Sequence, residues 1–489
     1  MQNFLNQLFD NKFFSFFLIF ILLVIIQEPS FKLFGSEVHY IGETLAKYKF
    51  IEHKYSSYIT HGSPLDYRYL FDYLTIFIYE IANQNIFYTC IIGRLLCALL
   101  FSFAFIHLSK TLNLDVINTL IIICAYMLMN QQLVGGDKLT GNGFNSAAIS
   151  YSLNILSISF LIRKKLIYSV IFIAISTNFH FVVGGFWATF IFITFFIKTL
   201  NLKKTLYFII FYIILSLPVI ILLFSKININ DSNLSEIAQI TAFRSKHQFL
   251  PFYSFEYFIW QIPGIAILLS IVFFIFINKE ENETHQYLKI LILTVFFQIT
   301  FSFIISPFDK NFLYSNFAPF RTSTLLLLII FYYISSKINL YQINKSLKIL
   351  VLIPFLVNVS YPALGRIIFD NVDNMFENNI TSKSELYDFI NNETKLEDVI
   401  FAVDDYNVTD LELITKRPSF FNWKKIPSNS YAILEWWNRY KILEEIKTKN
   451  CKKEYAYINY FIVSAQTDNL KNCGKIVFSN DQFKLLKNL

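Results

Sequence analysis

Long apolar runs recur through most of the chain and constrain its fold more than any other feature. A helix needs about 20 mainly apolar residues to cross a bilayer. A shorter apolar segment at 69–82 carries Asp72 and Glu80 and predicts an interfacial helix. The other runs predict a mainly α-helical, polytopic transmembrane bundle with about eleven spans. They lie at 13–26, 86–109, 116–133, 147–162, 166–177, 181–197, 206–224, 257–277, 288–306, 325–335 and 347–364.

Composition agrees with a membrane protein and excludes several other classes. Of the 489 residues, 55% are hydrophobic and 16% are charged, against about 25% charged in ordinary soluble domains. These values exclude a disordered protein, a disulfide-rich miniprotein and a soluble enzyme of this length. The net charge of +7 comes with no basic helix and no zinc-ligand spacing, so we expect no nucleic-acid partner.

Basic residues predict the orientation of the chain in the membrane. Loops rich in Lys and Arg stay in the cytoplasm, and the basic clusters here fall in alternate loops between the predicted spans. We therefore expect a multi-pass protein of a bacterial inner membrane, with a cytoplasmic N-terminus and the lipid bilayer as its partner. The sequence does not identify protein partners. The clusters comprise Arg163, Lys164, Lys165, Lys198, Lys203, Lys204, Lys337, Lys345 and Lys348.

A change in composition near residue 365 divides the chain into two predicted domains. Residues 1–364 form the transmembrane domain, with an outer first loop at 28–68, and residues 365–489 form a small extracytoplasmic α/β domain. Cys451 and Cys473 are disulfide candidates if this region is extracytoplasmic. Periodicity in the second domain predicts helices at 384–394 and 431–446 and strands at 399–403, 419–423, 457–464 and 475–478.

The predicted outer loops hold the candidate catalytic residues. Glu37, just after the first span, is a candidate general base, and Asp66 in the same loop is an alternative. His180 lies between two spans, where ionisable groups are costly and are often functional. A structural interpretation stays open for each: a solvated loop carboxylate for Glu37 and Asp66, and a packed or interfacial histidine for His180.

Other outer-loop residues are candidates for substrate binding. Basic side chains could clamp a lipid-linked phosphate, or they could contact lipid headgroups. The glycine-rich segment 135–143 could bring backbone N–H groups close to an anion, or it could be a plain interhelical turn. The candidates are His39, His61, Asp137, Lys138, Asn178, Arg244, His247 and Arg321.

These features resemble the GT-C class of membrane glycosyltransferases. In that class a first span precedes a long outer loop with a catalytic carboxylate, and many spans and often a C-terminal extracytoplasmic domain follow. Glu37 lies where that carboxylate would be, and Ser63-Pro64-Leu65 is similar to the entry to the next helices. The chain departs from the usual acidic pair, because His39 stands where a second acidic residue would be expected.

Four stretches also resemble a family of uncharacterised bacterial polytopic membrane proteins, described as a domain of unknown function. Relatives carry an Arg pattern upstream of Arg417-Pro418, where this chain has Asp410-Leu411-Glu412, which argues against an anion site there. The resemblance implies an architecture and no activity. The stretches are 135–137, 174–187, 417–427 and 435–439, of which 174–187 is the most specific.

The leading hypothesis is a GT-C-like glycosyltransferase with a polyprenyl-phosphate sugar as its donor. Glu37 or Asp66 would deprotonate the acceptor hydroxyl, while His180 would orient the phosphate. Arg244 and Arg321 would neutralise the leaving phosphate, and a divalent metal ion could take part. Two alternatives stay open: a transporter or flippase of a lipid-linked or small polar substrate, and a non-catalytic partner in surface-glycan assembly.

Overall fold

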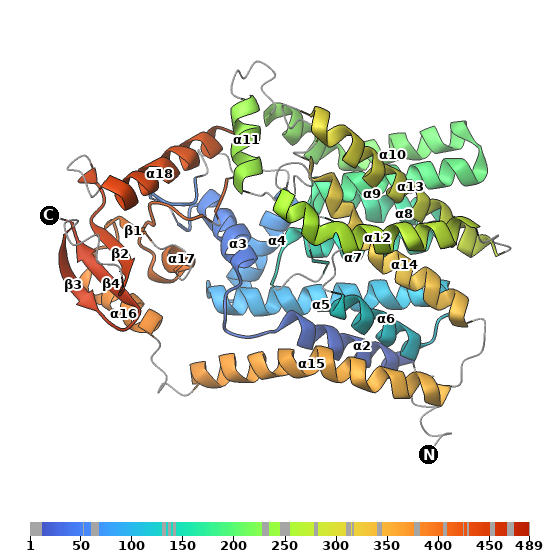
Figure 1. Cartoon of the computed structure of the whole chain (residues 1–489), viewed down its shortest axis with the longest axis horizontal. Coiled ribbons are helices and arrows are strands. Elements are labelled where there is room, and N and C mark those ends of the chain that lie inside the picture. The colour runs from blue at the N-terminus through green and yellow to red at the C-terminus, as the bar shows by residue number, and fades with distance from the viewer. Residues whose placement is uncertain are drawn as a thin grey trace. The chain divides into compact units, whose positions relative to one another are not determined.

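A computed structural model gives the fold of the chain, which is mostly helical with a small sheet among its described residues (Figure 1). Unit 1 comprises Met1–Pro29, Tyr67–Phe71 and Ile91–Ile367, and unit 2 comprises Ser30–Asp66, Asp72–Cys90 and Ile368–Leu489. The structure describes all residues except 1–11, 52, 60–67, 130–133, 135–137, 140–142, 227–233, 245–254, 278–281, 310–313, 315–316, 340–344, 376–381, 404–407, 424, 428–429, 450–454, 467–473 and 489.

Unit 1 is built from apolar helices that begin at polar capping residues. Asp115 accepts a hydrogen bond from Asn118 N at 2.7 Å, and Asn145 accepts one from Ala148 N at 2.9 Å. Such caps satisfy backbone donors that a helix start leaves unpaired. The helices are α2 (Lys12–Gln27), α5 (Ile86–Thr111), α6 (Val116–Leu128), α7 (Ser146–Ile162), α8 (Leu166–Phe179), α9 (Phe181–Thr199), α10 (Leu202–Lys226), α11 (Leu234–Arg244), α12 (Phe255–Ile277), α13 (Glu283–Ile305), η2 (Ser306–Phe308), η4 (Pro319–Arg321), α14 (Thr322–Asn339) and α15 (Lys345–Met375).

Within the described residues, six helices are long and apolar enough to cross a membrane. They are Ile86–Thr111, Phe181–Thr199, Leu202–Leu223, Glu283–Ile305, Pro319–Ile338 and Leu347–Gly365. The prediction of a mainly helical chain with several candidate spans is thereby confirmed. The remaining predicted spans are helical but shorter, so the total of about eleven stays a prediction. These are the shorter helices Phe13–Gln27, Val116–Leu128, Ser146–Ile162 and Leu166–Phe179, together with the Gly264–Phe273 part of α12.

Helices α10 and α15 turn apolar side chains outward from unit 1. Only 17% of the Leu202–Leu223 segment and 11% of the Leu347–Gly365 segment are buried. Water-exposed apolar surface of this extent is unusual for a soluble protein, whereas hydrocarbon would cover it without cost. The exposed side chains include Tyr207, Ile210, Ile214, Leu217, Leu350, Ile353 and Val357.

Contacts at the helix ends pair loops that the charge pattern assigns to the same face. Lys164, between α7 and α8, forms a 2.7 Å ion pair with Glu283 at the start of α13. Lys348 of α15 forms a 3.3 Å ion pair with Asp115, between α5 and α6. These four residues all lie at helix ends predicted to be cytoplasmic. The pairing agrees with the predicted alternation of faces, while the orientation itself stays a prediction.

Helices α7 and α8 pack against each other along a row of serines. Ser150 lies 2.6 Å from Ser176, and Ser157 lies 3.0 Å from Ser169, measured between hydroxyl oxygens. Ser176 also donates a hydrogen bond to Asn154 Oδ1 at 2.5 Å. Small side chains let helix backbones approach closely, and their hydroxyls satisfy one another away from water. This row fixes the helix pair that leads into the α8–α9 turn.

Unit 2 carries a four-stranded sheet in the order β1-β2-β4-β3, which joins helices from both ends of the sequence. Strand β1 (Ile400–Ala402) pairs in parallel with β2 (Tyr460–Ser464), and β4 (Phe483–Lys487) pairs antiparallel with both β2 and β3 (Lys475–Ser479). The helices are α3 (Gly35–Lys47), α4 (Tyr69–Ile81), α16 (Ser382–Glu393), α17 (Leu411–Thr415) and α18 (Ser430–Lys449). Helices α4, α5 and α15 have residues in both units.

The sheet buries a different set of side chains on each face. Leu386 and Ile390 of α16 pack with Ile400, Ile462 and Leu485 in one hydrophobic core. On the other face aromatic rings lie in contact, with 5.3 Å between the ring centroids of Phe401 and Phe420 and 5.4 Å between those of Phe420 and Tyr457.

One sequence-based prediction for this sheet is wrong, and one strand was missed. Residues 419–423 form no strand, because only Ser419 bridges to Ile400, and Asn422 then turns its side chain to donate to Thr409 O at 2.8 Å. Strand β4 was not predicted, although Asn480 sets the turn before it by accepting hydrogen bonds from Gln482 N and Phe483 N. The predicted helices 384–394 and 431–446 are confirmed as α16 and α18.

Two adjacent glycines of α9 give the first prediction. A β-carbon at Gly184 would overlap the Thr177 backbone of α8, whereas one at Gly185 would meet no atom within 4 Å. Gly184→Ala should therefore lower the thermal unfolding temperature of the detergent-solubilised protein. Gly185→Ala should leave it unchanged or raise it, because Ala favours helix by about 1 kcal/mol over Gly. Equal effects of the two substitutions would contradict this packing.

Candidate functional site

His180 forms the turn between α8 and α9, in unit 1. It is the single residue between the two helices, has an extended backbone and is almost fully buried. Its Nδ1 accepts a hydrogen bond from Val183 N at 3.4 Å, which caps α9. Accepting this bond requires that Nδ1 carries no proton. The structure thus gives His180 a capping role, and its proposed catalytic role stays a prediction.

Asn178, two residues earlier, uses both ends of its amide within unit 1. Its Nδ2 donates to Ala174 O at 2.8 Å and to Leu215 O of α10 at 3.1 Å. Its Oδ1 accepts from the Tyr69 hydroxyl at 3.0 Å. Asn178 therefore holds α8 against α10 and the start of α4, and it thereby fixes the backbone that leads to His180.

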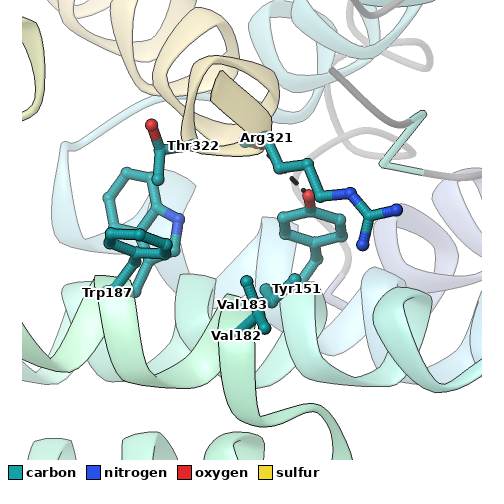
Figure 2. Close-up of a pocket in the computed structure, with 7 residues that line it drawn as sticks. Tyr151, Val182, Val183, Trp187, Arg321 and Thr322 are labelled. Carbon is teal, nitrogen blue, oxygen red and sulfur yellow. Dashed lines mark hydrogen bonds between the residues drawn. The ribbon is translucent and has the colours of Figure 1, made fainter. Parts of the chain in front are cut away.

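A small crevice lies beside this turn (Figure 2). Its volume is about 10 Å³, roughly that needed for one water molecule. Val183 connects the crevice to the turn, because its backbone donates to His180 and its side chain lines the crevice. The lining residues are Tyr151 of α7, Val182, Val183, Phe186 and Trp187 of α9, Arg321 of η4 and Thr322 of α14.

Trp187 supplies the most informative polar atom of this crevice. The residue is 1% exposed, and among the described residues its indole N–H has no hydrogen-bond acceptor. Buried donors are nearly always satisfied, by protein or by an ordered molecule. In Figure 2 the Trp187 and Tyr151 rings flank the crevice, and the indole nitrogen lies on the side that faces Tyr151. An oxygen atom of a bound molecule would satisfy this donor.

Arg321 places a cation at the edge of the crevice. Its backbone carbonyl accepts from the Tyr151 hydroxyl at 3.4 Å, and its guanidinium extends past the Tyr151 ring, away from Trp187 (Figure 2). The neighbouring Thr322 hydroxyl is already engaged, because its single proton has acceptors in Pro319 O at 2.8 Å and Gln298 Oε1 at 2.9 Å. The crevice thus offers an N–H donor inside and a guanidinium at its edge, which suits an anionic oxygen.

Several other predicted residues lie away from the crevice or are not described. Lys138 is exposed, and Arg244 is half-buried at the end of α11. Neither belongs to the described lining of the crevice. Asp66, His61, Asp137, His247 and the disulfide candidates Cys451 and Cys473 lie outside the described residues, so predictions about them stay untested.

Glu37 lies in unit 2, in the first turn of α3. It is fully buried, and its Oε2 accepts a hydrogen bond from Phe34 N at 3.0 Å. The interpretation as a solvated loop carboxylate is therefore wrong, because the side chain caps its own helix inside the fold. His39 lies on the same helix, with its ring 4.9 Å from that of Tyr40. Because Glu37 and His180 belong to different units, a shared catalytic arrangement stays a prediction.

A buried charge network in unit 2 was missed by sequence reasoning. Glu412 of α17 is fully buried and accepts hydrogen bonds from Ser56 Oγ, from Ser57 N at 3.2 Å and from Ser57 Oγ at 2.5 Å. Lys425 Nζ lies 3.5 Å from Glu412 Oε2 and donates to Ser57 Oγ at 2.9 Å. Ionic groups this deep persist only when paired and hydrogen-bonded, so the network fastens residues 56–57 to the C-terminal segment.

The Ser57, Lys425 and Glu412 side chains have the residue types of an activated serine nucleophile. The contacts of Lys425 argue against that role, because its Nζ donates to Ser57 Oγ and pairs with Glu412. The ion pair with Glu412 also requires a protonated ammonium, which cannot accept the serine proton. A structural role therefore accounts for this group better.

Two arginines complete the same region by satisfying backbone carbonyls. Arg439 of α18 donates to Ser56 O at 2.7 Å and to Phe420 O at 2.9 Å. Arg417 donates to Asn391 O at 2.8 Å and to Thr394 O at 2.9 Å, both at the end of α16. Terminal carbonyls of a helix lack partners within the helix, and the rigid fork of a guanidinium can satisfy several at once.

A larger polar depression lies on unit 2. Its volume is about 430 Å³, which falls within the range of small-molecule sites. Its described lining carries two acidic and two basic side chains, Glu393, Asp398, Lys395 and Lys487, together with Asn459 and Asn488. Burial, and then the charges of Asp398 and Glu393, raise the pKa of the adjacent Tyr460 phenol.

Comparison with known families identifies one segment of the chain. Residues 382–443 match the model of DUF6798, a domain of unknown function. Two of the four stretches on which the sequence resemblance rests, 417–427 and 435–439, lie inside this segment, which also contains Glu412, Lys425 and Arg439. A comparison with curated proteins finds no match. Among the described residues, no group of three or more His, Cys, Asp or Glu side chains could hold a metal ion.

Arg417 gives the second prediction. Arg417→Lys should lower the free energy of unfolding of unit 2 by about 2 kcal/mol, because an ammonium cannot reach Asn391 and Thr394 together. Thermal unfolding monitored by the near-ultraviolet signal of the tryptophans would measure the loss. Lys441→Met, a change at an exposed residue of α18, is the control and should have little effect. Full stability in Arg417→Lys would contradict the role of the guanidinium.

Proposed function

We propose that the chain is a membrane protein that binds a lipid-linked phosphate at the crevice of unit 1, whose water-sized volume admits one phosphate oxygen. The main support is the Trp187 indole N–H, which has no acceptor among the described residues and lines the crevice together with Arg321. An N–H donor and a guanidinium together suit a phosphate oxygen. The crevice follows the turn at His180, which the charge pattern assigns to the outer face of the membrane.

The reaction that best fits such a ligand is glycosyl transfer from a polyprenyl-phosphate sugar, in a GT-C-like protein at the outer face of a bacterial inner membrane. Glu37 or Asp66 takes the proton of an acceptor hydroxyl, whose oxygen then attacks the anomeric carbon. The bond between that carbon and the phosphate oxygen breaks, and the polyprenyl phosphate leaves with the bonding electrons. Arg321 and Arg244 stabilise its charge, and His180 orients it. The described lining of the crevice has no carboxylate, imidazole or thiolate and therefore does not fit a divalent metal ion.

Phosphate recognition gives the third prediction. Trp187→Phe keeps the ring and removes only the N–H donor, and Arg321→Gln removes the charge. Each should weaken binding of polyprenyl phosphate about tenfold, while binding of the neutral polyprenol should stay unchanged. Native mass spectrometry of the detergent-solubilised protein would measure both lipids.

The control for this experiment is Lys337→Gln, at the other end of α14 from Arg321. It should leave polyprenyl phosphate binding unchanged. The phosphate site would be refuted if Trp187→Phe and Arg321→Gln bound polyprenyl phosphate as tightly as the unaltered protein.

The proposed base gives the fourth prediction. Glu37→Gln retains an oxygen that can accept from Phe34 N, so α3 should stay folded. It should reduce transfer from a radiolabelled polyprenyl-phosphate hexose by at least about a hundredfold. Binding of polyprenyl phosphate should stay unchanged. The exposed Glu236→Gln of α11 serves as the control. If Glu37→Gln kept full transfer, Glu37 would be excluded as the base.

A transporter or flippase is the second candidate function, and the α7–α8 serine row favours it. Asn154 is fully buried in this row, and its Nδ2 has no acceptor among the described residues. Polar groups at membrane depth often mark substrate paths. A transporter needs no general base, so it would keep its activity in Glu37→Gln. In a non-catalytic role in surface-glycan assembly, the polar depression of unit 2 would instead be the binding site.

A further inference from the structure

Tyr58 connects the buried charge network of unit 2 to helix α3. The Lys425 ammonium lies 3.8 Å above the centre of the Tyr58 ring. At this distance a buried cation is attracted to the face of an aromatic ring. Because Lys425 also contacts Glu412 and Ser57, the position of the Tyr58 ring is set from the DUF6798 segment.

The other side of Tyr58 contacts α3 directly. Its hydroxyl donates to Val38 O at 2.6 Å, and its ring occupies the space where a β-carbon of Gly42 would be. Burial, together with the charge of Glu412, raises the pKa of this phenol well above its ordinary value. Tyr58 therefore stays protonated at physiological pH and remains a donor to α3.

Helix α3 is also fixed at its other end. Thr44 Oγ1 donates to Asp72 Oδ1 at 2.6 Å, and Lys47 Nζ lies 3.3 Å from Asp72 Oδ2 of α4. The contacts of Asp72 hold the last turns of α3, whereas Tyr58 holds its first turns. Glu37 lies one residue before Val38, so the contact with Tyr58 is the nearer restraint on its carboxylate.

We propose that the DUF6798 segment positions α3 and its Glu37 carboxylate through Lys425 and Tyr58. Glu412 and Lys425 hold residues 56–58, and Tyr58 holds the first turns of α3. Lys425 and Tyr58 are positioning residues in this account. The segment thereby organises a helix that precedes it by more than 300 residues in the sequence, and it needs no chemistry of its own. The relevance to transfer rests on the proposed role of Glu37.

The test is hydrogen–deuterium exchange of the full chain in detergent, with variants that separate the two contacts of Tyr58. Tyr58→Phe keeps the ring under Lys425 and removes only the hydrogen bond to Val38. It should speed exchange of the amides in peptides covering 35–42 about fivefold, while exchange at 411–443 stays unchanged. Lys425→Met should speed exchange at both 53–58 and 35–42. Lys441→Met, whose ammonium lies 5.8 Å above the Trp437 ring at the surface, should change neither.

The outcomes separate this inference from the proposed function. Unchanged exchange at 35–42 in Tyr58→Phe would overturn the positioning role, even if Glu37→Gln abolished transfer. If Lys425→Met fails to fold, Tyr58→Phe still tests the positioning role by itself, because it removes only the hydrogen bond to Val38. In the transfer assay Tyr58→Phe should lower kcat several-fold with KM unchanged. If exchange at 35–42 is faster in Tyr58→Phe but transfer is unchanged in Glu37→Gln, the positioning role of Tyr58 stands and the catalytic role of Glu37 is refuted.

Discussion

The need to satisfy polar groups away from water organises the described parts of both units. Glu412 and Lys425 illustrate it best, because a buried ion of either sign is costly unless it is paired and hydrogen-bonded. Their remaining partners come from Ser56 and Ser57, and Ser57 precedes Glu412 by 355 residues. This requirement joins the polar stretch after the first helix to the DUF6798 segment within one unit. In unit 1, Asn178 and His180 follow the same rule, since the side chain of each forms a hydrogen bond with the backbone of a neighbouring helix.

The departures from this rule indicate where another molecule could bind. The Trp187 indole lines a crevice that also has Arg321 in its lining, and its N–H finds no acceptor within the described chain. A tryptophan can lie in an apolar helix bundle at no cost for its ring, but its N–H normally finds a partner. In the proposed function a lipid-linked phosphate supplies that partner. The apolar outer surfaces of α10 and α15 agree with this setting, because the carrier lipid and unit 1 would share the same bilayer.

Hydropathy predicted much of the helical part because the bilayer imposes a length and a polarity on each span. Local patterns also identified α16, α18 and three of the described strands. The failures have specific causes. Residues 419–423 have the apolar content of a strand, but their backbone pairs with β1 only next to Ser419 before Asn422 turns away. Glu37 was identified as a candidate site residue, but its burial was not predicted. Its burial depends on helix α3, and the polar composition of this stretch suggested a loop. The Glu412 network could not be found, because residues far apart in sequence meet only in the folded chain; the one local signal was the charged Lys425 within an aromatic-rich stretch.

The most direct test of the central claim is an electron cryomicroscopy structure of the full chain in lipid nanodiscs that contain polyprenyl phosphate. The account predicts phosphate density within hydrogen-bonding distance of the Trp187 indole nitrogen, with the Arg321 guanidinium turned toward it. Phosphate density bound elsewhere on the protein, with a water molecule or nothing beside Trp187, would contradict it.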